Sequence, residues 1–356
     1  MKITGLLVGL SLLVATPVWA ETPQDVRIIP MQNAQQPFEV AAKLQWNPHD
    51  GQWEKVLVVY NGNATPPDTH PVWAYLRGLA VPNRPPRQAG ENLYYKAFHA
   101  DAFCSGATPL TAGKPMSISF EQDTLGAYNQ KDFFRDWNCP GWNMGLNNVS
   151  VVDGVGSRNG DGKGLRINLL KGRSGCPENG GACANWKPHI GAQLNTLTYS
   201  YWVKFPDNFD FVLGGKLPGI GSYNARTGGV KPNGRDGWSV RVMWDKSAQL
   251  GQYVYHVDQQ SNFGDFFMWD APPVERGKWY QIKTQVRLNT AGQSNGTITT
   301  WLNGKPVLDK RDLRFQLSDD LKIERFLFSV FFGGSGAQWA PRADQQVYLD
   351  DFVLTP

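Results

Sequence analysis

The sequence has few cysteines and no cluster of basic residues. After its first twenty residues it has no apolar run that approaches membrane length. Its 356 residues carry 35 Lys+Arg against 31 Asp+Glu, a formal net charge of +4. So mild a charge, without a basic run, argues against a nucleic-acid partner. The 38 glycines and 24 prolines are too few for a collagen-like or low-complexity chain. An aromatic content of 12% argues against a long disordered protein.

The first twenty residues are typical of a secretory signal peptide. A short positive start, Met1-Lys2, precedes an apolar stretch over residues 3–13, and the segment ends Val18-Trp19-Ala20. We expect cleavage after Ala20 and a periplasmic or secreted protein with no membrane association after cleavage. The alternative is a membrane anchor, although the apolar stretch is short for a span.

Four cysteines are an even number, and an exported chain meets an oxidising compartment. They are Cys104, Cys139, Cys176 and Cys183. We favour the pair Cys176–Cys183, because neighbouring glycines let a tight loop close, and the pair Cys104–Cys139 then remains. The spacings lack a CxxC pair, which argues against a metal site.

Strand patterns dominate from about residue 115. Short runs alternate apolar and polar residues between Gly, Pro, Asn and Asp. The dipeptide Asn303-Gly304 between two such runs predicts a hairpin turn. Many short strands without a comparable helical pattern predict an all-β fold, a β-jelly roll or concanavalin-like sandwich, over residues 113–356. The runs cover residues 117–120, 164–169, 196–205, 237–244, 252–256, 279–288, 296–302, 325–332 and 346–354.

Residues 21–112 differ in pattern from the rest of the chain. They contain strand-like pieces at 38–46 and 55–60 and a proline-rich stretch at 81–86, which predicts an extended connector. We expect an N-terminal extension or small accessory module, with a boundary near residue 112.

One candidate functional residue is a lysine inside a glycine-rich stretch. Lys216 lies between Gly214-Gly215 and Leu217-Pro218-Gly219. The glycines leave space for a ligand close to the backbone, so Gly215 is a candidate binding position. The alternative is an ordinary surface turn with a solvated lysine.

Two alternating patterns place further polar residues on one strand face. In Ser239-Val240-Arg241 the serine and arginine share a face, and Tyr253 and Tyr255 share a face in the same way. If the two strands are neighbours, one sheet face presents all four side chains. Arginine pairs with a carboxylate through two hydrogen bonds, so such a face suits an acidic sugar polymer. The alternative is a half-buried strand pair with good β propensity.

Several neighbouring residues are weaker candidates. His189 and Gln193 could line the same site, although a structural role for His189 is the alternative. His256 follows Tyr255 and should point to the opposite face. By the same alternation, Trp238 and Trp244 should pack in the core.

In its motifs the chain resembles polysaccharide lyase family 14. The order Gly-Gly-Lys-Leu-Pro-Gly at 214–219, Ser-x-Arg at 239–241 and Tyr-x-Tyr at 253–255 carries the resemblance, together with the closing segments at 331–335, 339–341 and 348–352. It covers residues 115–356 approximately. The resemblance implies a β-jelly roll that cleaves alginate or polyglucuronate by β-elimination. It also implies catalytic roles for Lys216, Ser239, Arg241, Tyr253 and Tyr255.

β-Elimination at a uronate needs a cation for the carboxylate, a base for the C5 proton and an acid for the departing O4. Arg241 suits the carboxylate. Lys216 could neutralise or act as base, Tyr253 or Tyr255 could act as base or acid, and Ser239 could orient the sugar or a catalytic partner. Clustered cations should lower the pKa of both residue types, which favours an alkaline optimum unless the shift is large. We expect an anionic polysaccharide substrate, no required cofactor and a monomer; a structural metal is left open.

Two other functions compete with this interpretation. A glycoside hydrolase would need two carboxylates across the site, and the adjacent Asp350 and Asp351 should point to opposite faces. A non-catalytic protein that binds acidic polysaccharide is the second alternative. Ultraviolet absorbance of an unsaturated product distinguishes a lyase from both.

Overall fold

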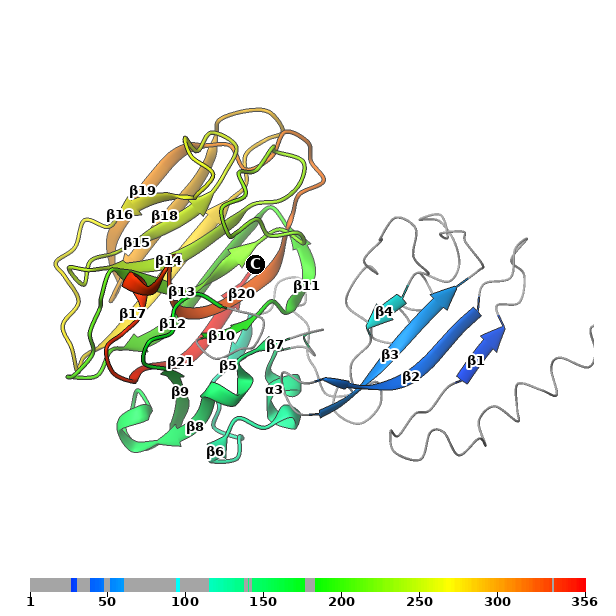
Figure 1. Cartoon of the computed structure of the whole chain (residues 1–356). Coiled ribbons are helices and arrows are strands. Elements are labelled where there is room, and N and C mark those ends of the chain that lie inside the picture. The colour runs from blue at the N-terminus through cyan, green and yellow to red at the C-terminus, as the bar shows by residue number, and fades with distance from the viewer. Residues whose placement is uncertain are drawn as a thin grey trace, which may run out of the picture. The chain divides into compact units, whose positions relative to one another are not determined.

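The computed structural model describes the backbone of four N-terminal strands and residues 115–356 except 138–139, 141–142, 177–182 and 335. The expected signal segment, the proline-rich stretch and the pair Cys104–Cys139 lie outside the described residues. The chain divides into two compact units, Met1–Ser105 and Gly106–Pro356 (Figure 1). No helix in the described part of the chain is both long and apolar enough to cross a membrane.

The first unit contains one antiparallel sheet of four strands. Its order is β1–β2–β3–β4, and successive strands pair as neighbours. The two longest strands overlap the strand-like pieces expected at 38–46 and 55–60. The strands are β1 (Arg27–Pro30), β2 (Glu39–Asn47), β3 (Gln52–Tyr60) and β4 (Tyr94–Lys96).

The second unit is a sandwich of two antiparallel sheets, which confirms the expected all-β class (Figure 1). In the eight-stranded sheet, β13 and β20 lie at the centre, and β11 (His189–Leu194) pairs with β20 beside the main path. The path runs β16 (Asp265–Met268), β15 (Leu250–Tyr255), β14 (Ser239–Asp245), β13 (Gly214–Gly221), β20 (Ile323–Phe332), β10 (Cys183–Trp186) and β7 (Asn143–Met144).

The nine-stranded sheet has β12 and β21 at its centre, and β5 (Met116–Ile118) pairs with β21 beside the main path. The helical elements of this unit are short: α3 (Gln130–Asp136), η4 (Leu146–Asn148), η5 (Gly154–Gly156) and η6 (Ala337–Trp339). The sheet path runs β19 (Lys305–Leu313), β18 (Gly296–Leu302), β17 (Trp279–Arg287), β12 (Thr196–Lys204), β21 (Gln345–Thr355), β9 (Lys163–Leu169), β8 (Val149–Asp153) and β6 (Gly126–Ala127).

Aromatic side chains from both sheets meet in the core. Phe352 of β21 lies 5.8 Å from the rings of Phe326 and Phe328 of β20, and Trp137, beyond α3, contacts all three rings. Burying each such side chain stabilises the fold by about 1.5–3 kcal/mol. The alternation read from the sequence therefore positions the sheets, because it directs these rings inward.

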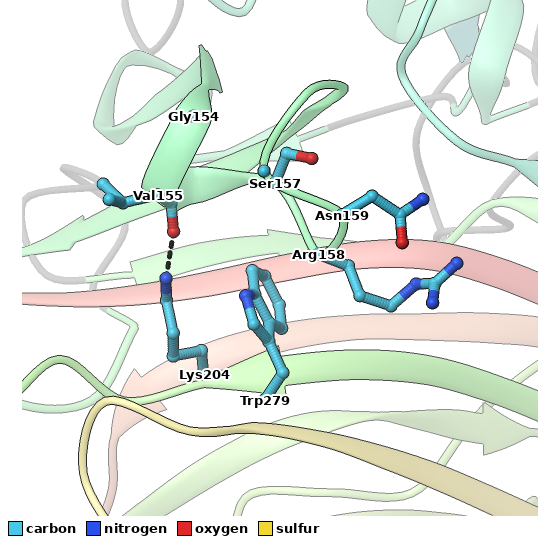
Figure 2. A pocket seen from close by; sticks show the side chains of 8 residues that line it. Gly154, Val155, Ser157, Arg158, Asn159, Lys204 and Trp279 are labelled. Carbon is cyan, nitrogen blue, oxygen red and sulfur yellow. Dashed lines mark hydrogen bonds between the residues drawn. The ribbon is translucent and has the colours of Figure 1, made fainter.

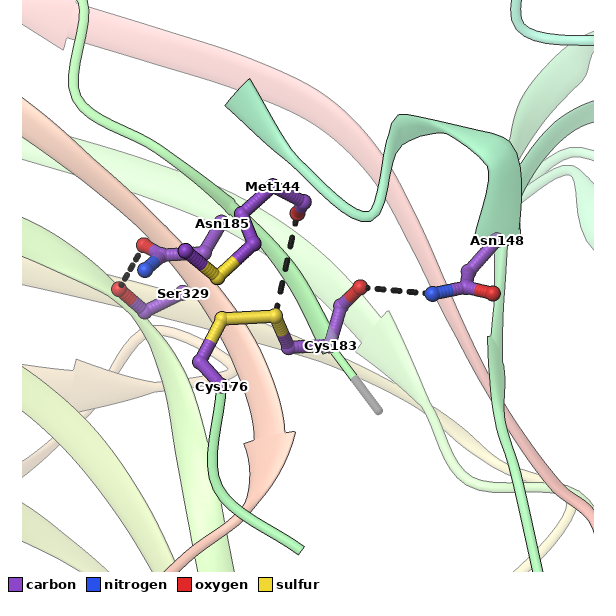
Figure 3. The surroundings of a disulfide bond; sticks show 6 residues. All are labelled: Met144, Asn148, Cys176, Cys183, Asn185 and Ser329. Atoms are coloured by element: carbon purple, nitrogen blue, oxygen red, sulfur yellow. Dashed lines mark hydrogen bonds between the residues drawn. A yellow bond between two sulfur atoms is a disulfide. The ribbon is translucent and has the colours of Figure 1, made fainter. Parts of the chain in front are cut away.

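Two local predictions are confirmed. The turn between β18 and β19 has positive φ at both Asn303 (50°) and Gly304 (79°), as a two-residue hairpin of this type requires. The disulfide Cys176–Cys183 is present, with Cα atoms 5.3 Å apart (Figure 3). The amide of Asn148 donates a hydrogen bond to the Cys183 carbonyl at 2.9 Å, which fixes the disulfide to the sandwich.

Candidate active site

A bulge in β13 turns Lys216 to the outer face of the eight-stranded sheet. Lys216 pairs with Met243 and Gly219 pairs with Arg241, so β13 has one more residue than β14 between these pairs. Pro218 occupies the bulge, where a residue without an N–H is tolerated. The Tyr201 hydroxyl, from the opposite sheet, donates a hydrogen bond to the Pro218 carbonyl at 3.2 Å. Without the extra residue, alternation would direct Lys216 into the core.

The neighbouring strands bring the four predicted polar residues onto the same outer face. Arg241 of β14 pairs with Tyr253 of β15, and Ser239 pairs with Tyr255. The intervening valines and both flanking tryptophans are fully buried, as the alternation predicts; they are Trp238, Val240, Val242, Trp244 and Val254.

Lys216, Arg241 and Tyr253 converge on this surface, which we call the Lys216 face. The Lys216 Nζ lies 4.1 Å from the centre of the Tyr253 ring, and the Arg241 Cζ lies 5.7 Å from it. The Lys216 Nζ also donates to Met243 Sδ at 2.9 Å. The three groups are therefore close enough to act on one bound sugar.

The two cations are buried. Lys216 is 6% exposed and Arg241 is 4% exposed. Burial, and then the positive charge of Arg241, lowers the pKa of Lys216 well below its usual value. No described residue accepts a hydrogen bond from the buried Arg241 Nε. A buried guanidinium without a carboxylate is costly, so the geometry favours an anionic ligand.

The two tyrosines differ in their surroundings. Tyr255 is 1% exposed, and its hydroxyl accepts a hydrogen bond from the Gly229 N–H at 2.9 Å. Tyr253 is half-buried, and burial, followed by the influence of Tyr255, raises its pKa above the usual value. The expectation that clustered cations lower the tyrosine pKa is wrong for Tyr253, because desolvation exceeds the effect of Arg241.

Ser239 supports a loop. It is fully buried, and its hydroxyl donates to the Arg226 carbonyl at 2.6 Å. This contact fixes the loop at Arg226, and the hydrogen bond from the Gly229 N–H to Tyr255 fixes it at Gly229. Ser239 therefore uses its hydroxyl proton to hold the loop, whereas Tyr255 only accepts a hydrogen bond from it.

Gly219 lets the strands approach closely beside Arg241. A Cβ at this position would lie 2.0 Å from the Val240 carbonyl oxygen and 2.6 Å from the Arg241 Cα. Any larger residue would push β14 away.

The weaker candidates are Gly215, Gln193 and His189. A Cβ on Gly215 would point at the Trp244 ring in the core, 2.0 Å from its nearest atom, so Gly215 faces away from the Lys216 face. Gln193 is exposed, and its amide donates to Glu324 at 2.8 Å. His189 pairs with Arg325 across β11 and β20, and burial followed by Arg325 lowers its pKa to about 4.

Sequence reasoning missed three residues near the site. Met243 contacts Lys216, and its position two residues after Arg241 could have revealed it. Lys187 lies within electrostatic reach of Arg241 and Arg325, and burial followed by these charges lowers its pKa to about 8. Arg325 donates to the Lys187 carbonyl at 3.1 Å, and its guanidinium lies 4.5 Å from the Tyr223 ring.

The expectation for Asp350 and Asp351 is wrong. A bulge in β21, with φ of 48° at Asp351, turns both side chains outward, where both accept hydrogen bonds from Arg158. They lie on the nine-stranded sheet and so provide no acid–base pair beside Lys216. The described residues also contain no group of three His, Cys, Asp or Glu side chains that could hold a metal ion.

A sequence model of polysaccharide lyase family 14 matches residues 157–352, more than half of the chain. The chain belongs to polysaccharide lyase family 14. The match includes all five residues that the resemblance assigned to catalysis, and it confirms the family expected from their order.

Individual proteins are similar to parts of the chain. The Exolysin of Paramecium bursaria Chlorella virus 1 is 28% identical over 193 residues, 46% of this chain, but the chain spans only 30% of that protein. Alginate lyase Aly36B is 25% identical, with a TM-score of 0.59 over 69% of this chain and 98% of its own. The family 14 alginate lyase of Aplysia kurodai is 23% identical, with a TM-score of 0.57 over 67% of this chain and 98% of its own, and shares the fold.

Proposed function

We propose that this family 14 protein cleaves a uronic-acid polymer, of alginate or glucuronan type, by β-elimination. The observation that supports this most directly is the convergence of two buried cations, Lys216 and Arg241, on the ring of Tyr253. A mutant of the similar Aly36B was solved with an alginate trisaccharide, which is consistent with an anionic polysaccharide as ligand.

Arg241 neutralises the carboxylate of the sugar to be cleaved. Its guanidinium stays protonated even where burial lowers its pKa, and a desolvated charge-assisted pair is about twice as strong as a neutral hydrogen bond. Pairing withdraws charge from the carboxylate and makes the neighbouring C5 proton more acidic.

Lys216 then serves as the base. Its lowered pKa leaves a larger unprotonated fraction at neutral pH than a solvated lysine has. The neutral amine takes the C5 proton, and the electron pair left on C5 forms the C4=C5 double bond as the C4–O4 bond breaks.

Tyr253 serves as the acid. Its raised pKa keeps the phenol protonated through the neutral and mildly alkaline range, so it has a proton to give to the departing O4. Of the two tyrosines, Tyr253 is the more accessible, whereas Tyr255 is buried. This assignment selects among the roles that the sequence left open.

The test is ultraviolet absorbance of the unsaturated product. The chain without residues 1–20 is incubated with alginate, polyglucuronate and other acidic polysaccharides from neutral to alkaline pH, beside Lys216→Ala. An absorbance increase that Lys216→Ala loses supports the proposal and identifies the polymer. Binding without any increase would instead favour the non-catalytic alternative.

Export is part of this proposal, because residues 1–20 have the pattern of a signal peptide. Expression of the full chain in a bacterial host and N-terminal sequencing of the processed protein test it. A first residue of Glu21 is expected, and an uncleaved protein in the cytoplasm contradicts it.

A further inference from the structure

A surface cavity lies on the outer face of the nine-stranded sheet. Its volume is about 440 Å³, and the loop of residues 154–160 lines it together with Lys204 of β12 and Trp279 of β17. Figure 2 shows the Lys204 side chain and the Trp279 indole side by side beneath this loop. We call this feature the Trp279 cavity. The cavity is open to solvent and not enclosed.

Aromatic rings and cations alternate at this cavity. The Lys204 Nζ lies 4.9 Å from the Trp279 ring and 5.0 Å from the Tyr348 ring. Both rings belong to residues directly opposite Lys204 on the flanking strands, so the row crosses three strands. A second pair lies beside it, with the Arg158 guanidinium 4.8 Å from the Trp202 ring.

The protein holds both cations in place. Lys204 is 9% exposed, and its Nζ donates to the Val155 carbonyl (Figure 2). Arg158 donates from Nε to Asp351 at 2.7 Å, and its backbone N–H donates to Asp350 at 2.9 Å. Because the cations are fixed, a ligand that pairs with them loses less conformational entropy than one that must order them.

The aromatic rings are not needed for the core of the sandwich. On β12 the fully buried side chains are those that alternate with Trp202 and Lys204, namely Leu197, Tyr199, Tyr201 and Val203. Trp202, Trp279 and Tyr348 are only half-buried on the opposite side of the strand layer. Flat rings beside fixed cations suit a pyranose that carries a carboxylate, because the ring covers the apolar sugar face and the cation pairs with the acid.

We propose that the Trp279 cavity is a second, non-catalytic binding site for the acidic polysaccharide. The identity of this polymer rests on the proposed function. The cavity lies on the sheet opposite to the Lys216 face, so one polymer can occupy both sites only by bending around the sandwich, and two chains can occupy them at once. Retention of polymer at this site raises its local concentration near the Lys216 face.

The experiment counts binding sites by isothermal titration calorimetry. The full mature chain carrying Lys216→Ala, which prevents turnover, is titrated separately with hexasaccharides of alginate, of polyglucuronate and of neutral cellulose. An acidic hexasaccharide is expected to occupy a site that Trp279→Ala weakens at least about tenfold. Trp279→Phe should restore most of the affinity, because it keeps a flat ring.

Matched variants separate this site from the Lys216 face. Trp301→Ala removes another aromatic ring from the same sheet face, where Lys283 lies 5.2 Å from it, but Trp301 does not line the cavity. It should leave the binding unchanged. Arg241→Ala should weaken only the site on the Lys216 face. Circular dichroism of each variant confirms that it is folded.

The proposal stands if one site is sensitive to Trp279→Ala, insensitive to Trp301→Ala and Arg241→Ala, and selective for the acidic hexasaccharides. It is overturned if no site has this pattern, or if the cellulose hexasaccharide binds there equally well. Failure of the proposed function has a different signature, because the wild-type protein would then give no ultraviolet absorbance increase with any polymer while the site sensitive to Trp279→Ala remains.

Discussion

Replacing Tyr253 by phenylalanine removes one oxygen atom and leaves the rest of the Lys216 face intact. The ring that lies 4.1 Å from the Lys216 Nζ and 5.7 Å from the Arg241 Cζ remains, so both cations keep their packing. If the phenol protonates O4, kcat should fall about 10²–10⁴-fold, which corresponds to about 3–5 kcal/mol in the barrier. KM should change little, since Arg241 still binds the carboxylate.

The assay is the initial rate of ultraviolet absorbance over a range of pH. The rate should rise with pH through the lowered pKa of Lys216 in both proteins, because the base must lose its proton. The matched control is Tyr255→Phe, which removes the acceptor of the Gly229 N–H at a cost of about 1 kcal/mol but leaves the acid in place. The reasoning is refuted if Tyr253→Phe keeps more than a tenth of the wild-type kcat, or if Tyr255→Phe loses more than Tyr253→Phe.

Three further substitutions test the same structure. Lys216→Met should abolish turnover and raise the melting temperature at neutral pH. Because the folded-state pKa of Lys216 is lowered, its cost to stability is full below that pKa and disappears only as the pH approaches the unfolded-state value of about 10.4. Tyr201→Phe should lower the free energy of unfolding in urea by about 1 kcal/mol, because it removes the hydrogen bond to the bulge in β13. Tyr199→Phe should lower it less, since the Tyr199 hydroxyl makes no hydrogen bond of ordinary geometry to a described residue. Cys176→Ala/Cys183→Ala opens a loop of sequence separation 7 and should lower the free energy of unfolding by about 2–3 kcal/mol; an unchanged melting temperature would contradict the entropic account.

The fold and the shared face of the main site residues follow from short-range rules, whereas the family resemblance assigned these residues to catalysis. Alternation assigned Ser239 and Arg241 to one face and directed Trp238 and Trp244 inward, because successive side chains of a strand point to opposite sides. The turn at Asn303 was equally predictable, since few residue types accept its positive φ.

Bulges account for the positions that alternation misplaced. Asp351 takes φ of 48° in a bulge of β21, so it lies on the same side as Asp350 and not opposite to it. The orientation of Lys216 depends in the same way on the extra residue at Pro218. A proline inside a strand indicates a bulge. Which sheet face the neighbouring side chains take, however, depends on the pairing with the partner strands.

The electrostatics of the site were beyond sequence reasoning because burial decides them. Cations near Tyr253 should lower its pKa, yet desolvation raises it, and the depth of burial depends on the packing of several strands. The same burial lowers the pKa of Lys216. One physical cause therefore moves the two pKa values in opposite directions, as the proposed roles of base and acid require.

Substrate binding should shift this balance in a measurable direction. In the free protein the positive charge of Arg241 helps to lower the pKa of Lys216. A uronate carboxylate beside Arg241 adds a negative charge that offsets this effect, so the pKa of Lys216 should be higher in the complex than in the free protein. Because kcat/KM reports the free protein and kcat reports the complex, the rising limb of kcat should lie at higher pH than that of kcat/KM. If the two limbs coincide, the carboxylate does not bind at Arg241 within reach of Lys216, and Lys187 or Arg325 becomes the better candidate for its partner.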